Sequence, residues 1–411
     1  MATAPRTLLR ARWLTTMNAP PVEDGAVLID CGKVVAAGKS SEIETGSGDF
    51  IVEDYGDAVV LPGLVNPHVH LELSHVMPPA QGMSFTEWLL HVMSSAGPTD
   101  PIGASKEGVR QCLRFGVTTV GDISRNCAEV RRVLAASPLR AVSYGEVVGM
   151  ARRRHVTGSR LAAALDLAPT PRLGPGVSPH APYSIDADGY RRCIATATTN
   201  GVPLATHLAE SPDEAQFLAD HTGPFRELWE RLDAWDDSVP PFKGGPIRYA
   251  EHLGLLRELC VLAHVNYCDD EELNLLAAGD GVVVYCPRTH AYFRHPPHRW
   301  RDMLDAGIEV AVGTDSCASS GDLNVVDDLR SMHRLAPDVP ALTLWAMVTL
   351  TAAYALGVPA GEILQGGSAD VVVFPAARKD PLKDVLETSV LPLAVWVEGR
   401  PIDSTVMGPA R

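Results

Sequence analysis

The sequence predicts an α/β fold: a (β/α)8 TIM barrel with a small β-sandwich domain that both termini form together. The length of 411 residues exceeds that of an ordinary single domain but suits one large barrel with a smaller partner. Through the middle of the chain, short apolar runs alternate with amphipathic helical segments, which is typical of a parallel sheet buried on both faces. The two ends lack this alternation. We therefore expect the sandwich halves at 1–58 and 364–411, and the barrel at 59–363.

The barrel elements are expected in a regular order along the chain. Eight runs predict strands at 59–66, 117–122, 139–148, 173–180, 202–207, 260–265, 281–286 and 309–313. Helices are expected at 105–116, 186–201, 269–279 and 299–306. Asp186 is the expected N-cap of the second of these helices, and Asp269 with Glu272 resembles a capping box at the third. Eight such units favour a closed barrel, and a doubly wound open sheet is the alternative.

The terminal segments are rich in β-branched residues but contain no strand–helix alternation. Two expected strands near the N-terminus, 25–30 and 33–38, stand at hairpin spacing. Two more are expected at 369–374 and 394–399 near the C-terminus. Each end is too short to bury a core of its own. We therefore expect the two ends to pair with each other.

Composition and charge narrow the class of protein. The net charge of −15 disfavours a nucleic-acid partner, because phosphates require a basic face. No apolar stretch approaches the about 18 residues of a membrane span, and the N-terminus shows no signal peptide. The eight cysteines form no CxxC pair, which favours buried reduced thiols. These features predict a cytoplasmic protein with a small-molecule substrate and no nucleic-acid or membrane partner, and they leave a homodimer open.

Two histidines follow the first expected barrel strand. His68 and His70 are separated by one residue, so on a strand both side chains point to the same side. If that side faces a pocket, the pair can hold one metal ion from two directions. Such a pair is weak evidence for a metal site on its own, because exposed histidines are common.

Further candidate ligands stand where the other expected strands end. A lone histidine in an apolar strand is usually a hydrogen-bonded core residue, but several at one end of a barrel indicate a shared site. Imidazoles with one carboxylate suit Zn²⁺, Fe²⁺ or Mn²⁺ and leave a position open for water. The six groups are His68, His70, His180, His207, His264 and Asp315.

A single metal ion is the simpler interpretation of these groups. His68, His70, His207 and Asp315 make a mononuclear site. A bridged pair of ions would usually need another anionic ligand, such as a modified lysine, at the strand where this chain has His180. The expected cofactor is one divalent ion, Zn²⁺ first, with Fe²⁺ or Mn²⁺ as alternatives. Such an ion lowers the pKa of its water towards neutrality and makes hydroxide available.

Two further residues suit proton transfer and charge stabilisation. Glu210 lies three residues beyond His207, where its carboxylate can reach the pocket without binding the metal. That placement suits a proton shuttle between water and a ring nitrogen or leaving group, although a surface glutamate that opens a helix is the alternative. His264, if it is not a ligand of a second metal, can hydrogen-bond the hydroxide or the developing alkoxide.

Several motifs together resemble the amidohydrolase superfamily. They are most similar to its branch of cytosine, guanine and adenosine-type deaminases and triazine hydrolases, and they span essentially the whole chain. The motifs are Leu-Pro-Gly-Leu at 61–64 before His68 and His70, Thr-His-Leu-Ala-Glu-Ser at 206–211, Cys-Pro-Arg at 286–288, Gly-Thr-Asp-Ser at 313–316 and Gly-Gly-Ser-Ala-Asp at 366–370.

The resemblance implies a metal-dependent hydrolytic deaminase. In that branch the matching residues His68, His70, His207 and Asp315 bind the metal, and Asp315 also helps to deprotonate the metal-bound water. Glu210 then serves as acid and base, and His264 orients the water.

The segments 70–74 and 85–89 are similar to aminodeoxyfutalosine deaminases of the futalosine route to menaquinone. Those enzymes hydrolyse the adenine amino group of a nucleoside that carries a benzoate. On this interpretation Glu72 accepts hydrogen bonds from a ribose, Trp88 or Phe85 stacks on a flat ring, and His180 bonds a purine nitrogen. Arg288 pairs with a substrate carboxylate. As alternatives, Trp88 is a core residue and Arg288 neutralises nearby acids.

The chain departs from the branch pattern at 289–295, where Thr-His-Ala-Tyr-Phe-Arg-His replaces a frequent Ser-Asn. We expect this segment to contact the substrate. Deaminases of adenosine, S-adenosylhomocysteine or guanine, and a triazine-type chloro- or aminohydrolase, are alternatives. The mononuclear site disfavours a hydantoinase-like or dipeptidase-like amide hydrolase, and the presence of all six groups disfavours a non-catalytic barrel.

Overall fold

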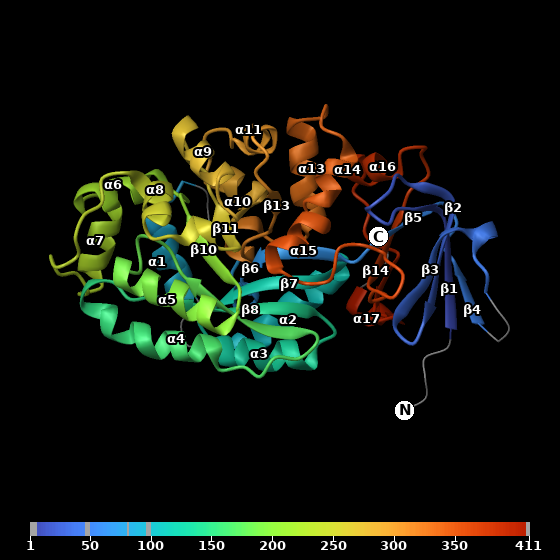
Figure 1. Cartoon of the computed structure of the whole chain (residues 1–411), viewed down its shortest axis with the longest axis horizontal. Coiled ribbons are helices and arrows are strands. Elements are labelled where there is room, and N and C mark those ends of the chain that lie inside the picture. Colours follow the sequence, from blue (N-terminus) through green and yellow to red (C-terminus); the bar gives the residue numbers. More distant parts are fainter. Residues whose placement is uncertain (1–5, 46–49, 80–81, 96–99, 408–411) are drawn as a thin grey trace.

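The barrel is a sheet of eight parallel strands. The computed structural model describes residues 6–45, 50–79, 82–95 and 100–407. Each barrel strand pairs with the next one along the chain, and the barrel fills the left and centre of Figure 1. The strands are β6 (Leu64–Val69), β7 (Val117–Ser124), β8 (Arg140–Val147), β9 (Leu173–Pro179), β10 (Leu204–Leu208), β11 (Cys260–His264), β12 (Val282–Tyr285) and β13 (Val310–Val312).

The barrel is nearly closed, because its two edge strands, β6 and β13, meet through a bridge. Val69 of β6 pairs in parallel with Asp315, which follows β13. The backbone N–H of Asp315 donates to the carbonyl of His68 at 3.1 Å. This seam confirms the predicted barrel and contradicts the open sheet. It also places the end of β6 beside Asp315.

The apolar run that was expected as the first barrel strand is in fact two strands. β5 (Ala58–Pro62) pairs with strands of the terminal segments, whereas β6 pairs with β7 in the barrel. Gly63 separates them, and a Cβ at this position would collide with the side chain of Thr118. The barrel sheet therefore starts at Leu64, later than expected. The domain limits themselves stay a prediction.

Helices surround the barrel, and three of them test the sequence signals. Asp186 caps α5 (Ala187–Asn200), and Asp269 with Glu272 forms a complete capping box at α9 (Asp270–Ala277), as predicted. α2 (Pro101–Arg114) begins one turn before the expected start, after the N-cap Asp100. The remaining helices are α1 (Phe85–Ser95), α3 (Cys127–Ala136), α4 (Thr157–Leu165), α6 (Pro212–Asp220), α7 (Pro224–Arg231), α8 (Gly245–His252), α10 (Pro287–Tyr292), α11 (Trp300–Asp305), α12 (Cys317–Ser320), α13 (Val325–Leu335), α14 (Ala341–Ala346), α15 (Leu350–Leu356), α16 (Pro381–Glu387) and α17 (Ser404–Met407).

Both termini build a second, mixed sheet, on the right of Figure 1, where blue and red segments lie side by side. Its order is β16-β15-β14-β5-β1-β2-β3, and β4 also pairs with β1. The strands from the ends of the chain pair with each other, as predicted, through the antiparallel contact of β5 with β14. They are β1 (Arg6–Leu14), β2 (Val22–Asp30), β3 (Lys33–Lys39), β4 (Phe50–Asp54), β14 (Val371–Pro375), β15 (Ala394–Val397) and β16 (Arg400–Pro401).

The shared strands are buried on both faces. Val59 and Leu61 of β5 pack in the main core cluster with the barrel, whereas Val60 packs in a separate cluster within the terminal sheet. Val372 and Val371 of β14 divide in the same way. Because strand side chains alternate between faces, this sheet can bury one face in its own core and the other against the barrel.

Two expectations about the chain as a whole can be compared with the structure. All eight cysteines are unpaired, and six of them are buried, as predicted for reduced thiols. Within the part of the chain that the structure describes, none of the helices combines the length and the apolar character that crossing a membrane requires.

Candidate active site

The four predicted metal ligands come together at the barrel seam. His68 and His70 lie at the end of β6, His207 lies on β10, and Asp315 follows β13. The Nε2 atoms of His70 and His207 are 3.2 Å apart. Oδ1 of Asp315 lies 3.6 Å from Nε2 of His70 and 3.8 Å from Nε2 of His68. The strand ends therefore converge on one small volume.

Hydrogen bonds orient two of these imidazoles. Nδ1 of His70 lies 2.9 Å from the carbonyl oxygen of Ile123, and Nδ1 of His207 lies 3.0 Å from that of His180. Because a carbonyl only accepts, both rings carry their proton on Nδ1. Their Nε2 lone pairs face each other, which is the arrangement that metal-binding histidines use.

His68 provides the test of whether a metal ion fits here. Its side chain is completely buried, and neither ring nitrogen has a hydrogen-bond partner among the described residues. A buried imidazole without partners is unfavourable unless a ligand compensates it. Burial also holds the pKa values of His68 and His207 well below the ordinary range, so both rings are neutral and can donate lone pairs. The residues present fit a divalent ion.

Asp315 is held with one oxygen directed to the histidines. Its backbone has a positive φ of 59°, which is uncommon outside glycine. Oδ2 accepts hydrogen bonds from Ser319 Oγ at 2.9 Å and from Thr289 Oγ1 at 3.3 Å. Oδ1 is thereby left for the site. Burial raises the pKa of Asp315, and the nearby His70 counteracts part of this effect.

Glu210 lies beside the ligands, where the sequence places it. Its Oε2 accepts a hydrogen bond from the hydroxyl of Tyr183 at 3.0 Å, and its Oε1 lies 3.3 Å from Nε2 of His264. The backbone N–H groups of Ala209 and Glu210 donate to the buried carboxylate of Glu214, which fixes the turn. Burial, together with the charges of Asp315 and Glu214, raises the pKa of Glu210 well above its usual range. Such a carboxyl can carry a proton at neutral pH.

His264 is close enough to the centre for either of its two interpretations. Ligand atoms of His68, His207 and His264 lie within 4.8 Å of one another, and so do those of His68, His70 and Asp315. His68 belongs to both groups. The site can therefore hold either one ion with His264 beside it or two neighbouring ions. The mononuclear site stays a prediction.

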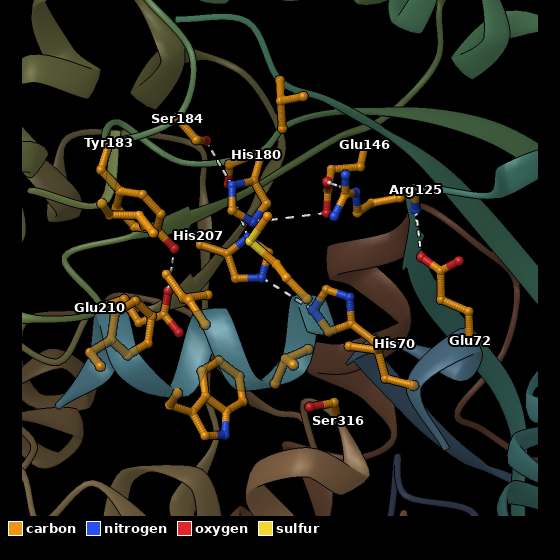
Figure 2. A pocket seen from close by; sticks show the side chains of 18 of the residues that line it. His70, Glu72, Arg125, Glu146, His180, Tyr183, Ser184, His207, Glu210 and Ser316 are labelled. Carbon is orange, nitrogen blue, oxygen red and sulfur yellow. Dashed lines mark hydrogen bonds and ion pairs between the residues drawn. The ribbon is translucent and has the colours of Figure 1, made fainter. Parts of the chain in front are cut away.

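A cavity of about 620 Å³ opens from this centre. In Figure 2, His180 and His207 lie between Glu210 with Tyr183 on one side and Glu146 with Arg125 on the other. The rest of the lining includes a set of apolar side chains from α1 and α7 and the residues next to them: Phe85, Trp88, Leu89, Val92, Met93, Leu228, Trp229 and Leu232.

Three of the four predicted substrate-binding residues line this cavity: Glu72, Trp88 and His180. Glu72 already accepts three hydrogen bonds, from the backbone N–H groups of Arg125 and Asn126 and from the Asn126 side chain. A carboxylate has about four acceptor positions, so one remains for a ligand. The indole N–H of Trp88 donates to the carbonyl of Ala318. Trp88 is therefore both a packed residue and part of the wall.

Arg288 is the prediction that the structure contradicts, since it does not line the cavity. Its guanidinium donates to the carboxylates of Asp322 and Asp328 at 2.6 and 3.0 Å and to three backbone carbonyls. A guanidinium has about five N–H donors, so none is left for a substrate. The segment 289–295 does not line the cavity directly, although Phe293 packs against Phe85 and Trp88 of its wall. Its contact with the substrate stays a prediction.

Sequence reasoning missed several pocket residues. Glu146, at the end of β8, lies 3.8 Å from His180 Nε2 and 3.6 Å from Arg125 Nε. Burial raises its pKa. The available signal was a carboxylate near the C-terminal end of the expected strand 139–148, where active groups of a barrel gather. The others are Tyr183, Arg125, Arg153 and Arg160, which follow barrel strands in loops or short helices.

The chain combines a parallel barrel with a cluster of histidines and one carboxylate at the strand ends. This combination is typical of metal-dependent hydrolases. The chain belongs to the amidohydrolase family, whose model matches residues 59–402. This assignment confirms the resemblance found in the motifs. Enzymes of this family depend on metal, and the chain is a hydrolytic enzyme of the deaminase type.

Individual proteins show the same similarity. The chain is 29% identical to a 5-methylthioadenosine/S-adenosylhomocysteine deaminase of Natronomonas pharaonis, over 96% of this chain and 88% of the relative. It is 29% identical to the aminodeoxyfutalosine deaminase of Deinococcus radiodurans, over 76% and 77%. The crystal structure of an adenosine deaminase from Xanthomonas campestris with bound zinc superposes with a TM-score of 0.81 at 21% identity, over 98% and 95%. The last likeness concerns the fold alone.

Proposed function

We propose that the protein hydrolyses the adenine amino group of a nucleoside whose far end carries an anionic group. Aminodeoxyfutalosine is the first candidate, and S-adenosylhomocysteine is the second. The observation that carries the proposal is the cavity itself, where Glu210 and the candidate ligands stand at one end. The rest of the lining includes many apolar residues and three arginines, Arg125, Arg153 and Arg160. The similarity to deaminases of both substrates supports it.

The residues of the centre have different roles in the proposed hydrolysis, and four of them are the candidate metal ligands. His68, His70, His207 and Asp315 would hold a divalent ion, which when bound supplies a Lewis acid that makes water nucleophilic at neutral pH. Zn²⁺ is the first candidate, and the bound zinc of the structural relative supports it. The two hydrogen bonds to Oδ2 of Asp315 keep its Oδ1 turned to the centre.

Glu210 is suited to move protons between water and the purine. As water adds to the ring carbon that bears the amino group, the Glu210 carboxylate takes up a proton from that water. It delivers this proton to the ring nitrogen. The remaining proton of the added hydroxyl then passes to the departing amine, so that the C–N bond breaks, ammonia leaves and a ring carbonyl remains. Tyr183 donates a hydrogen bond to one of its oxygens, and Nε2 of His264 lies 3.3 Å from the other. His264 is neutral because burial lowers its pKa, so it can donate a hydrogen bond to the developing alkoxide.

The polar residues deeper in the cavity suit the purine and the ribose. His180 is held through Nδ1 by the hydroxyl of Ser184 at 2.7 Å. Burial lowers its pKa to about 3, so the ring offers a neutral Nε2 to a purine nitrogen. The remaining acceptor position of Glu72 suits a ribose hydroxyl.

The arginines account for the proposed anionic group. Among the described residues Arg153 and Arg160 make no ion pair with a carboxylate. Arg153 lies over the Trp229 ring at 5.9 Å, and Arg160 donates to the carbonyl of Arg125. Cations without an anionic partner at the edge of an apolar cavity favour a ligand with a carboxylate.

This assignment predicts a substrate-dependent effect. Arg153→Ala and Arg160→Ala should each lower kcat/KM for aminodeoxyfutalosine by about 10- to 100-fold, because an ion pair with the substrate is lost. The same variants should change kcat/KM for uncharged 5′-methylthioadenosine by less than about threefold. Steady-state ammonia release measures both. Arg152→Ala is the matched control, since Arg152 is exposed and pairs with Asp233 outside the cavity. Equal losses on both substrates would remove the arginines from this role.

An ammonia-release screen tests the proposed function directly. The panel should contain aminodeoxyfutalosine, S-adenosylhomocysteine, 5′-methylthioadenosine, adenosine and guanine, together with a chlorotriazine for which chloride release is measured instead. We expect the highest kcat/KM with one of the two carboxylate-bearing nucleosides. Turnover restricted to guanine or the triazine would overturn the proposal and favour those branches of the family.

A further inference from the structure

The segment after β12 supports the catalytic centre from behind the pocket. It contains the residues at which the sequence departs from the branch pattern, and none of residues 286–300 lines the cavity. Two of its side chains nevertheless reach the centre. Thr289 donates to Oδ2 of Asp315, and Nε2 of His298 lies 2.9 Å from the carbonyl oxygen of His264.

We propose that His298 is a positioning residue that holds His264 in the orientation needed to hydrogen-bond Glu210 and the reacting oxygen. This inference rests on the proposed function, because it assigns His264 a part in that reaction. A carbonyl only accepts, so His298 carries its proton on Nε2 and donates it to His264. The contact is made to the backbone of His264, which leaves its side chain free to act.

The backbone at His264 is strained and needs such support. His264 has a φ of 74° and Val265 a φ of 48°, both in the left-handed region. A β-branched residue rarely adopts this conformation, so surrounding contacts must hold it. This turn ends β11 and directs the His264 side chain to within 3.3 Å of Glu210.

The peptide unit between these two residues is held on both sides. The carbonyl of His264 accepts from His298, and the N–H of Val265 donates to the carbonyl of Leu208 at 2.9 Å. Leu208 directly follows the candidate ligand His207 on β10. The peptide plane is therefore tied to the metal centre on one side and to His298 on the other.

His298 is itself rigid enough to serve as an anchor. Its ring stacks on Tyr285 of β12, with a centroid distance of 4.0 Å and an interplanar angle of 23°. Burial lowers its pKa to about 3, which keeps it neutral. Its Nδ1 is buried without a hydrogen-bond partner among the described residues, so its polar contacts run through Nε2.

Two substitutions distinguish the effect of the hydrogen bond that His298 donates from the effect of its ring packing. His298→Phe keeps an aromatic ring against Tyr285 but cannot donate, and it should lower kcat about 10- to 100-fold. KM should stay within about threefold, and metal content should not change. His298→Gln places an amide N–H near the same point and should restore kcat to within about threefold of the wild type. If the Phe variant does not fold, His298→Asn, whose amide is too short to reach, should show the same loss.

His295→Phe is the matched control, because His295 lies in the same segment but contacts Tyr267 rather than His264. Normal kcat in His298→Phe, equal losses in the Phe and Gln variants, or a loss that follows metal content would each overturn the proposal. Crystal structures of the wild type and of His298→Phe add a readout that needs no substrate. His264 should turn away from Glu210 in the variant, and an unchanged position would also overturn it. If the wild type deaminates none of the nucleosides, the proposed function fails, while these structures still decide the role of His298.

Discussion

Glu210→Gln should leave the fold and the bound metal unchanged but lower kcat by about 10²- to 10⁴-fold. The amide has nearly the same shape as the carboxyl, so it can still accept the hydrogen bond from Tyr183, but it cannot take up and release a proton. Steady-state ammonia release and elemental analysis of the purified variant measure the two quantities. Near-normal turnover would exclude Glu210 as the proton shuttle.

The surroundings of Glu210 explain why this position should be sensitive to substitution. The carboxyl is buried, and its raised pKa lets it hold a proton between two steps. Glu227→Gln is a matched control, because it makes the same chemical change at a residue that is exposed on α7 and does not line the cavity. It should retain full activity.

Removal of the metal should abolish activity and lower the melting temperature. Chelation leaves three imidazoles and a carboxylate buried together without a common partner, which destabilises the folded state. A ligand that binds only the folded state at about 1,000 times its Kd stabilises it by about 4.1 kcal/mol. Calorimetry with and without added Zn²⁺, Fe²⁺ or Mn²⁺ measures this effect. One equivalent per chain should restore both activity and melting temperature.

The stoichiometry decides between the two arrangements around His68. His68→Ala should lose the metal, whereas His264→Ala should retain it and lose turnover. Loss of metal from the His264 variant would show that His264 is a ligand, and two bound ions per chain would show that the mononuclear prediction is wrong.

The barrel and the metal centre were predictable because both follow from local rules. Side chains alternate along a strand, so His68 and His70 must share a side, and parallel strands must end at one edge of a sheet. Placing His207 and Asp315 with them required only the order of the elements. The two helix caps at Asp186 and Asp269 follow from similarly short-range hydrogen bonds.

The same local rules could not predict the partners of a long side chain or the sheet to which a strand belongs. Arg288 could in principle reach the pocket, but folding brings Asp322 and Asp328 to its guanidinium and saturates it. The run before His68 looked like one strand. In the structure it divides between two sheets at Gly63, which lies close to Thr118. In both cases the deciding partner lies more than 30 residues away along the chain.

By itself, the sequence predicted the residues that stand at the barrel mouth and the family of hydrolases. The family match confirms the second of these, and the roles of the ligands and of the proton shuttle stay predictions. Strand period and element order predicted that the candidate ligands converge, whereas the family rested on the resemblance of the motifs to known amidohydrolases. The tertiary structure alone decided what surrounds that chemistry. It showed that Arg153 and Arg160, rather than Arg288, line the cavity, and that the ring of His298 contacts the backbone carbonyl of His264. The reason is physical, because burial and pairing depend on which distant groups compete for the same hydrogen bonds once the chain has folded.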